Sequence, residues 1–202
     1  MEALLSFLLA SFLLTLAPGP DVLLVLSESL VRGTKAGLLL ASGLVCGLVF
    51  HTLIIVLGWG QFLGAYPQIV QGAKILGSIY FIYLSIQIFG NLNQKTFQLE
   101  RDSHEFNKNF KKGLIMNLLN PKVSLFFWLF FPGFLFSKEL SLGIQYAVLG
   151  SVFILQASIV FFVVSVAASK ISSFILSSSN YMYWTNFGQG VLLICIAFYF
   201  LI

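Results

Sequence analysis

The chain consists of long apolar stretches that are separated by short polar segments. A bilayer core about 30 Å thick is crossed by about 20 apolar residues in an α-helix, which rises about 1.5 Å per residue. Six stretches approach that length, and the period-two alternation typical of membrane β-strands is absent. The pattern predicts an all-α polytopic membrane protein whose six transmembrane helices lie at roughly 4–27, 37–60, 73–90, 113–136, 144–168 and 183–202.

The composition supports the same class. Of the 202 residues, 58% are hydrophobic and 9% are charged, whereas soluble domains have about 45–50% and about 25%. This content is too apolar for a disordered chain. The net charge is only +4, and the basic residues lie between apolar stretches instead of along one face, so we expect no nucleic-acid partner.

The longest polar segment, residues 91–112, divides the chain into two parts. We expect a single transmembrane domain over 1–202, with a first three-helix half at 4–90, this segment as a cytoplasmic loop, and a second half at 113–202. Because each half has an odd number of spans, the halves enter the membrane in opposite directions. The sequence therefore predicts two inverted three-helix repeats.

Lysine and arginine residues predict the orientation, because they are enriched in cytoplasmic loops. With both termini outside, eight of the ten basic residues in the connecting segments lie inside. These eight are Arg32, Lys35, Lys95, Arg101, Lys108, Lys111, Lys112 and Lys170. The first stretch has no basic residue before its apolar run, so we expect it to be retained and not cleaved as a signal peptide.

The first stretch is interrupted by Pro18, Gly19, Pro20 and Asp21. Proline lacks an N–H and clashes with the carbonyl four residues before it, so two prolines are expected to leave backbone carbonyls unpaired. Irregular backbone at membrane depth is tolerated only inside protein or beside a wet cavity. A carboxylate near a span centre costs about 2.5–3.5 kcal/mol. A kinked helix with a paired Asp21 is the structural alternative, but the cluster favours a functional site.

The fourth stretch has a similar break at Asn117, Asn120, Pro121 and Lys122. Pro121 is expected to leave the Asn117 carbonyl unpaired, and the asparagine side chains can bond to nearby backbone groups. Lys122 either extends to the inner surface or pairs with Asp21 inside the membrane.

The two breaks lie at matching places, since each falls in the first helix of its half. Interrupted helices at matching positions of inverted halves are typical of the midplane site of a secondary transporter. We therefore predict a substrate- or ion-binding site formed by Pro18, Gly19, Pro20, Asp21, Asn117, Asn120, Pro121 and Lys122.

Other polar residues allow two interpretations each. Glu28 follows Asp21 by two turns on the same face, and it is either a solvated helix end or a step on a proton path. His51 is either a packing residue or a titrating group. Gln156 either bonds neighbouring helices or lines the cavity. Small residues predict close helix packing at Gly33, Gly37, Gly43, Gly47 and Gly113.

These motifs together resemble the LysE/RhtB family of bacterial amino-acid exporters, also called LysE family translocators. The resemblance covers nearly the full length and rests on residues 16–21 and 110–122, the glycine pairs, Phe126, Phe127 and Pro132. It implies an inner-membrane, multi-pass carrier that exports amino acids by proton antiport, with no enzyme activity, cofactor or metal. No further intramembrane acid is evident for a cationic side chain, which favours a neutral substrate.

A membrane channel or a non-transporting membrane subunit is the main alternative, since pore rings depend on oligomer symmetry. An intramembrane enzyme fits less well, because Cys46 and Cys195 lie in non-equivalent spans and the sequence has no His-Glu-x-x-His zinc motif. The expected partners are an amino acid, protons and the lipid bilayer. The aromatic faces of the last spans are compatible with a homodimer.

Overall fold

The computed structural model describes residues 2–16, 19–59, 62, 65–90 and 106–170, and isolated residues between 183 and 198. Within these residues the chain is helical and contains no strand, as the sequence predicts. The helices are α1 (Glu2–Leu16), α2 (Pro20–Arg32), α3 (Thr34–Ile54), α5 (Pro67–Gly90), α6 (Phe106–Leu118), α7 (Pro121–Leu125) and α8 (Leu142–Lys170). They are joined by the π-helical turns η1 (Ile55–Trp59) and η2 (Phe126–Phe130) and the 3₁₀ turn η3 (Phe131–Phe134).

Two segments of the described chain, Thr34–Gly58 and Leu142–Ala168, are each long and apolar enough to cross a membrane, and two bent helix pairs raise the number of candidate spans to four. Large apolar side chains are exposed on the helices, including Leu9 (65%), Leu76 (68%) and Leu155 (65%). Such side chains suit a lipid environment and identify a membrane protein. Most of the predicted sixth span lies outside the described residues, so the count of six stays a prediction.

Both predicted helix breaks are present. Helices α1 and α2 meet at 53°, and the segments Lys108–Leu118 and Pro121–Phe134 meet at 48°. After each break the chain resumes at a proline, Pro20 in α2 and Pro121 in α7. Proline suits the first helical position because its missing N–H would have no partner there.

The backbone at the second break differs from the sequence expectation. The Asn117 carbonyl is not left unpaired by Pro121, because it accepts a hydrogen bond from the backbone N–H of Asn120 (3.1 Å). The side chain of Asn120 in turn caps α7, where its Oδ1 accepts from the backbone N–H of Lys122 (3.1 Å). The turn thus satisfies these groups locally, as helix ends commonly do.

Several helices extend beyond their apolar stretches. Helix α2 continues to Arg32, past the predicted end at 27, and α6 begins at Phe106, so the last part of the 91–112 segment is helical instead of loop. Backbone hydrogen bonding does not require apolar side chains, and a helix end can carry solvated groups. The exposed side of the first turns of α6 carries Lys108, Lys111 and Lys112.

Helices α3 and α6 approach closely through glycines. A Cβ on Gly43 would collide with the Phe110 carbonyl of α6, and a Cβ on Gly113 would collide with the Leu40 carbonyl of α3. Gly37 likewise faces Ser29 of α2. These contacts place the backbones of α3 and α6 against each other, as small residues allow in membrane helices.

Gly33 does not have the packing role that the sequence suggested. A Cβ built on Gly33 would meet nothing within 4 Å, and its φ is +84°. This left-handed backbone favours glycine, and the Gly33 N–H donates to the Ser29 carbonyl (3.0 Å) at the end of α2. Gly33 therefore forms the turn between α2 and α3.

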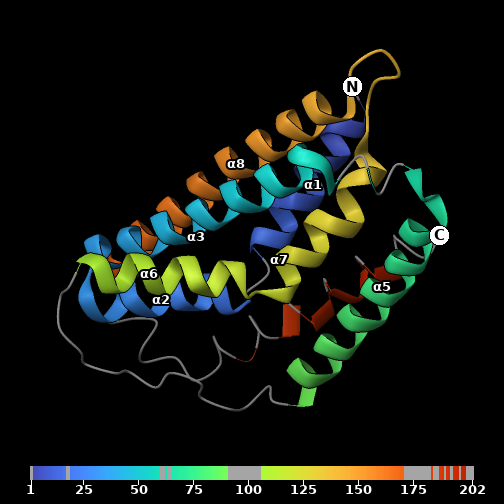
Figure 1. Cartoon of the computed structure of the whole chain (residues 1–202). Helices are drawn as coiled ribbons and strands as arrows, with labels where there is room; N and C mark the ends of the chain where they lie inside the picture. Colours follow the sequence, from blue (N-terminus) through green and yellow to red (C-terminus); the bar gives the residue numbers. More distant parts are fainter. Residues whose placement is uncertain are drawn as a thin grey trace.

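Figure 1 shows α3 and α8 running side by side, with the shorter helices α2 and α6 next to their lower ends. Buried aromatic rings fill the region between the two halves. Phe7 of α1 lies edge-on to Phe131 at 5.0 Å, and Phe127 stacks on Phe153 of α8 at 5.3 Å. This aromatic core holds the broken segments against α8.

Candidate functional site

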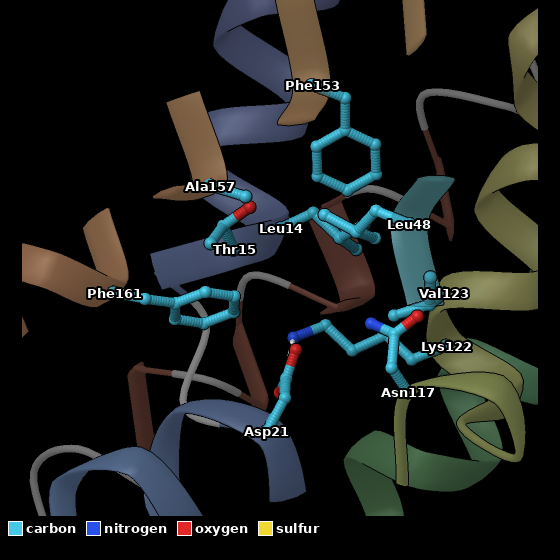
Figure 2. Close-up of a pocket in the computed structure, with 10 residues that line it drawn as sticks. All are labelled: Leu14, Thr15, Asp21, Leu48, Asn117, Lys122, Val123, Phe153, Ala157 and Phe161. Carbon is cyan, nitrogen blue, oxygen red and sulfur yellow. Dashed lines mark ion pairs between the residues drawn. The ribbon is translucent and has the colours of Figure 1, made fainter. Parts of the chain in front are cut away.

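The two helix breaks lie beside one pocket, to which six helices contribute (Figure 2). The lining residues come from the first, second, fourth and fifth predicted spans. The lining residues are Leu14 and Thr15 of α1, Asp21 of α2, Leu48 of α3, Asn117 of α6, Lys122 and Val123 of α7, and Phe153, Ala157 and Phe161 of α8.

Asp21 and Lys122 point toward each other in this pocket (Figure 2). Lys122 Nζ lies 3.9 Å from Asp21 Oδ1, and the two side chains are 3% and 6% exposed. The distance exceeds the roughly 2.7–2.9 Å of a charge-assisted hydrogen bond. The charges attract each other without a direct bond, and Lys122 is buried instead of extending to a surface.

Because Gly19 has no side chain, it leaves room for the Asp21 and Lys122 side chains. A Cβ on Gly19 would lie 2.7 Å from Asp21 Oδ1 and 2.9 Å from Lys122 Nζ. Any side chain at this position would therefore crowd both charged groups. Gly19 is the N-cap of α2 and makes no side-chain cap; Pro18, the remaining member of the predicted motif, lies outside the described residues.

The two asparagines of the second break have different surroundings. Asn117 lines the pocket and packs against Gly47 of α3, where a Cβ would collide with the Asn117 side chain. Its Oδ1 is buried and makes no hydrogen bond within the described part of the chain. Asn120 caps α7 and does not line the pocket. Asn117 is thus available to a bound ligand, whereas Asn120 shapes the break.

Gln156 connects two helices at the edge of the pocket. Its Nε2 donates to Thr15 Oγ1 (2.8 Å) and to the Ser11 carbonyl (3.2 Å) of α1. Thr15 in turn donates to the Ser11 carbonyl (2.8 Å). Of the two interpretations of Gln156, the geometry supports the interhelical bond, which sets the spacing of α1 and α8 beside the pocket.

Glu28 and His51 are not among the lining residues. Glu28 forms ion pairs with Arg32 (3.5 Å) and with Lys112 of α6 (3.3 Å). His51 is 2% exposed and stacks on Phe127, with ring centroids 5.3 Å apart. The contacts of Glu28 thus lie outside the Asp21–Lys122 pocket, whereas His51 lies next to Asn117, one of the lining residues.

The chain matches the model of the LysE type translocator family over residues 12–202. It belongs to this family. The resemblance seen in the sequence is confirmed, and the match extends across both helix breaks.

This translocator is also similar to individual curated proteins. The leucine efflux proteins of Salmonella choleraesuis and Salmonella typhimurium are each 29% identical to it over 147 residues, which is 72% of this chain and 69% of theirs. An uncharacterized membrane protein of Pseudomonas aeruginosa is 30% identical over 149 residues, or 71% of this chain and 69% of its own length. No solved structure matches the translocator.

The apolar lining of the translocator pocket was not anticipated from the sequence. Leu48, Phe153, Ala157 and Phe161 lie in spans that are apolar on every face, so hydrophobic periodicity does not separate pocket positions from lipid-facing ones. One usable signal is the spacing of Phe153, Ala157 and Phe161, which puts a small residue between two rings on one helix face.

The pocket is small in this conformation. Its cavity volume is about 10 Å³, which is about what one water molecule requires. An amino acid does not fit into this volume. Binding of a substrate of that size requires the lining helices to move apart, which is compatible with a carrier that alternates between conformations.

Proposed function

We propose that this translocator exports neutral amino acids across the bacterial inner membrane by proton antiport. The supporting observation is the buried Asp21–Lys122 pair between the two helix breaks, with its charged atoms 3.9 Å apart. An α-amino acid carries an ammonium and a carboxylate on one carbon. Both lose water on binding, and each then requires an opposite charge or dipole, because unpaired charge is costly in a low dielectric.

In this mechanism Asp21 binds the substrate ammonium, and Lys122 binds the carboxylate. The unpartnered Oδ1 of Asn117 can accept a hydrogen bond from the ammonium, and the N-terminal end of α2, whose dipole favours anions, supports the carboxylate. In the empty site the two charged residues face each other, and on loading each exchanges its partner for a substrate group. The net charge of the site is then near zero both in the empty state and in the loaded state, so binding of the substrate buries no uncompensated ion.

The proton couples to transport through Asp21. Protonation from the outside neutralises the carboxylate and weakens its hold on the ammonium, so the amino acid leaves outward. The carrier then returns to its inward-facing conformation with Asp21 protonated, and Asp21 releases the proton to the inside. Lys122 is the charged group that faces Asp21 among the described lining residues, so the proton and the substrate ammonium compete for the same carboxylate.

The proposal of a neutral substrate follows from the charges of the pocket. Among the lining residues, the ionisable side chains are Asp21 and Lys122, and both are used by the substrate backbone. A cationic or acidic substrate side chain would then lie against apolar groups. The leucine efflux proteins among the relatives support the same substrate class.

The topology remains part of the proposal. We take 1–202 as one domain of six spans in two inverted halves, with both termini outside. A cysteine in place of Asp102, in a chain whose Cys46 and Cys195 are replaced, is expected to resist an impermeant thiol reagent in intact cells and to react in inverted vesicles. Ready labelling in intact cells would contradict this orientation. Cross-linking in the membrane tests the homodimer separately.

Transport by the purified protein in liposomes tests the function itself. We expect saturable leucine flux that a proton gradient of opposite direction accelerates, and counterflow when both sides hold leucine. Lysine and glutamate serve as charged controls and are expected to move poorly. Flux equal to that of protein-free liposomes would reject the proposal, and non-saturable flux would indicate a channel.

A further inference from the structure

One face of α8 combines a small residue with two aromatic rings. Phe153, Ala157 and Phe161 are four residues apart, so they lie above one another on the helix. Their exposed fractions are 2%, 1% and 2%, and all three line the pocket (Figure 2). The α8 wall therefore has a recess at Ala157, bounded by the two rings.

The upper side of this recess is held in place by the aromatic core. The Phe153 ring lies 5.3 Å from that of Phe127 and 5.4 Å from that of Phe126, both of the second half, and 6.4 Å from that of Phe7. A ring with three aromatic neighbours in a close-packed interior has little freedom to move. Phe153 therefore gives the recess a defined edge.

The width of the recess is set by α1. Thr15 lies opposite Ala157 (Figure 2), and its hydroxyl accepts a hydrogen bond from Gln156, the neighbour of Ala157 (2.8 Å). This bond fixes the distance between the two walls at the level of Ala157. Because Leu14 completes the α1 wall, the side of the pocket facing the charged pair is predominantly apolar.

We propose that Ala157 is the specificity-determining residue of the amino-acid site and sets the size of the substrate side chain. This inference rests on the proposed function, because it assigns the ammonium and carboxylate to Asp21 and Lys122. The substrate side chain then projects toward α8 and enters the recess over Ala157. A medium-sized, branched aliphatic side chain fills such a recess, whereas an aromatic one enters the gap between the two rings and collides with the Ala157 methyl group at its floor.

The test compares Ala157→Gly, Ala157→Leu and the control Ala147→Leu, which changes another alanine of α8 outside the pocket lining. Export of alanine, leucine and phenylalanine is measured in competition by the purified proteins in liposomes. Ala157→Leu is expected to lower the leucine-to-alanine ratio at least about tenfold, since one methylene in an apolar pocket changes selectivity about 10–200-fold. Ala157→Gly is expected to raise the phenylalanine-to-leucine ratio, and Ala147→Leu to change neither ratio.

The outcomes separate the two proposals. Equal loss of all three substrates in Ala157→Leu, with unchanged ratios in Ala157→Gly, would reject the role of Ala157 while leaving the exporter proposal intact. Changed ratios in the Ala147→Leu control would also reject it. If Ala157→Leu does not fold, Ala157→Gly decides alone, because it removes atoms without overpacking. No amino-acid flux in the wild type would reject the exporter proposal and this inference with it.

Discussion

Helix α2 carries two acids, and each pairs with a lysine from a later helix, but the two pairs lie in different surroundings. Asp21 lies 3.9 Å from Lys122, and both side chains are almost fully buried. Glu28, two turns further along, lies 3.3 Å from Lys112, whose side chain is 47% exposed, and 3.5 Å from Arg32. The two acids are buried to a similar degree, with side chains 6% and 7% exposed, and it is their lysine partners that differ in access to water.

This difference determines what each pair can do. An exposed ion pair contributes about 0–1 kcal/mol, because water screens it. A buried pair that loses one partner leaves an uncompensated charge, at a cost of about 3–5 kcal/mol. Glu28 can release Lys112 at little cost and joins α2 to α6 as a structural contact. Asp21 and Lys122 can separate only when groups of matching charge replace them, which is what a zwitterionic substrate supplies.

The largest effect is expected for Asp21→Asn, which removes the buried carboxylate that faces Lys122. Leucine export is expected to fall at least about 100-fold, because a loss of about 3–5 kcal/mol spans two or more tenfold steps of about 1.4 kcal/mol. Export by the purified variant in liposomes, with and without a proton gradient, is the measurement, and its amount in the membrane is determined in parallel. Proton-coupled export at the wild-type rate would assign Asp21 a structural role in the helix break.

The two lysines provide a matched pair of substitutions. Lys122→Gln is expected to lower export about 10–100-fold, since a hydrogen bond to a charged group contributes about 1.5–3 kcal/mol. Lys112→Gln is expected to change it less than about twofold, because the exposed ammonium is screened and Arg32 still faces Glu28. Initial export rates of both variants at several leucine concentrations give the comparison. Equal rates in the two variants would remove the distinction between a buried and an exposed pair.

Gly19→Ala tests whether the spacing of the buried pair matters. The added methyl would lie 2.7 Å from Asp21 Oδ1 and 2.9 Å from Lys122 Nζ. We expect export to fall roughly fivefold, because overpacking costs about 1–3 kcal/mol and the tip of the lysine can shift in response. Gly72→Ala is the control, since a Cβ at Gly72 meets nothing within 4 Å. An unchanged export rate in Gly19→Ala would show that the pair tolerates displacement.

The helix class and both breaks could be predicted from the sequence, because their causes are local. Long apolar stretches predict helices, and a proline acts on a carbonyl only four residues away. The pairing partner of Asp21 could only be offered as one of two alternatives for Lys122. Its burial depends on how α2 and α7 pack, and no local pattern contains that information. The sequence predicted an unpaired Asn117 carbonyl. In the structure this carbonyl accepts from the backbone N–H of Asn120, because the turn at the break brings that group within reach.

The apolar part of the site could not be predicted for a different reason. In a soluble helix, the polar face identifies the buried face by contrast, but α8 has apolar residues on every face of the span. Ala157 and the equally apolar but 59% exposed Ile159 therefore look alike in sequence. The structure separates them by packing, since one faces the pocket and the other the outside.

The smallest effect on transport is expected for Glu28→Gln, which tests directly the acid whose lysine partner is exposed. The substitution leaves Arg32 and Lys112 without the carboxylate between them, so we expect lower thermal stability in detergent but export within about twofold of the wild type. The stability difference is expected to shrink as salt is raised from about 0.01 M to about 1 M, because the screening length falls from about 30 Å to about 3 Å. Asp102→Asn, a neutralisation in the predicted loop, serves as the control. A Glu28→Gln variant that folds and transports leucine but no longer responds to a proton gradient would place Glu28 on the proton path instead, and the two acids of α2 would then act in series.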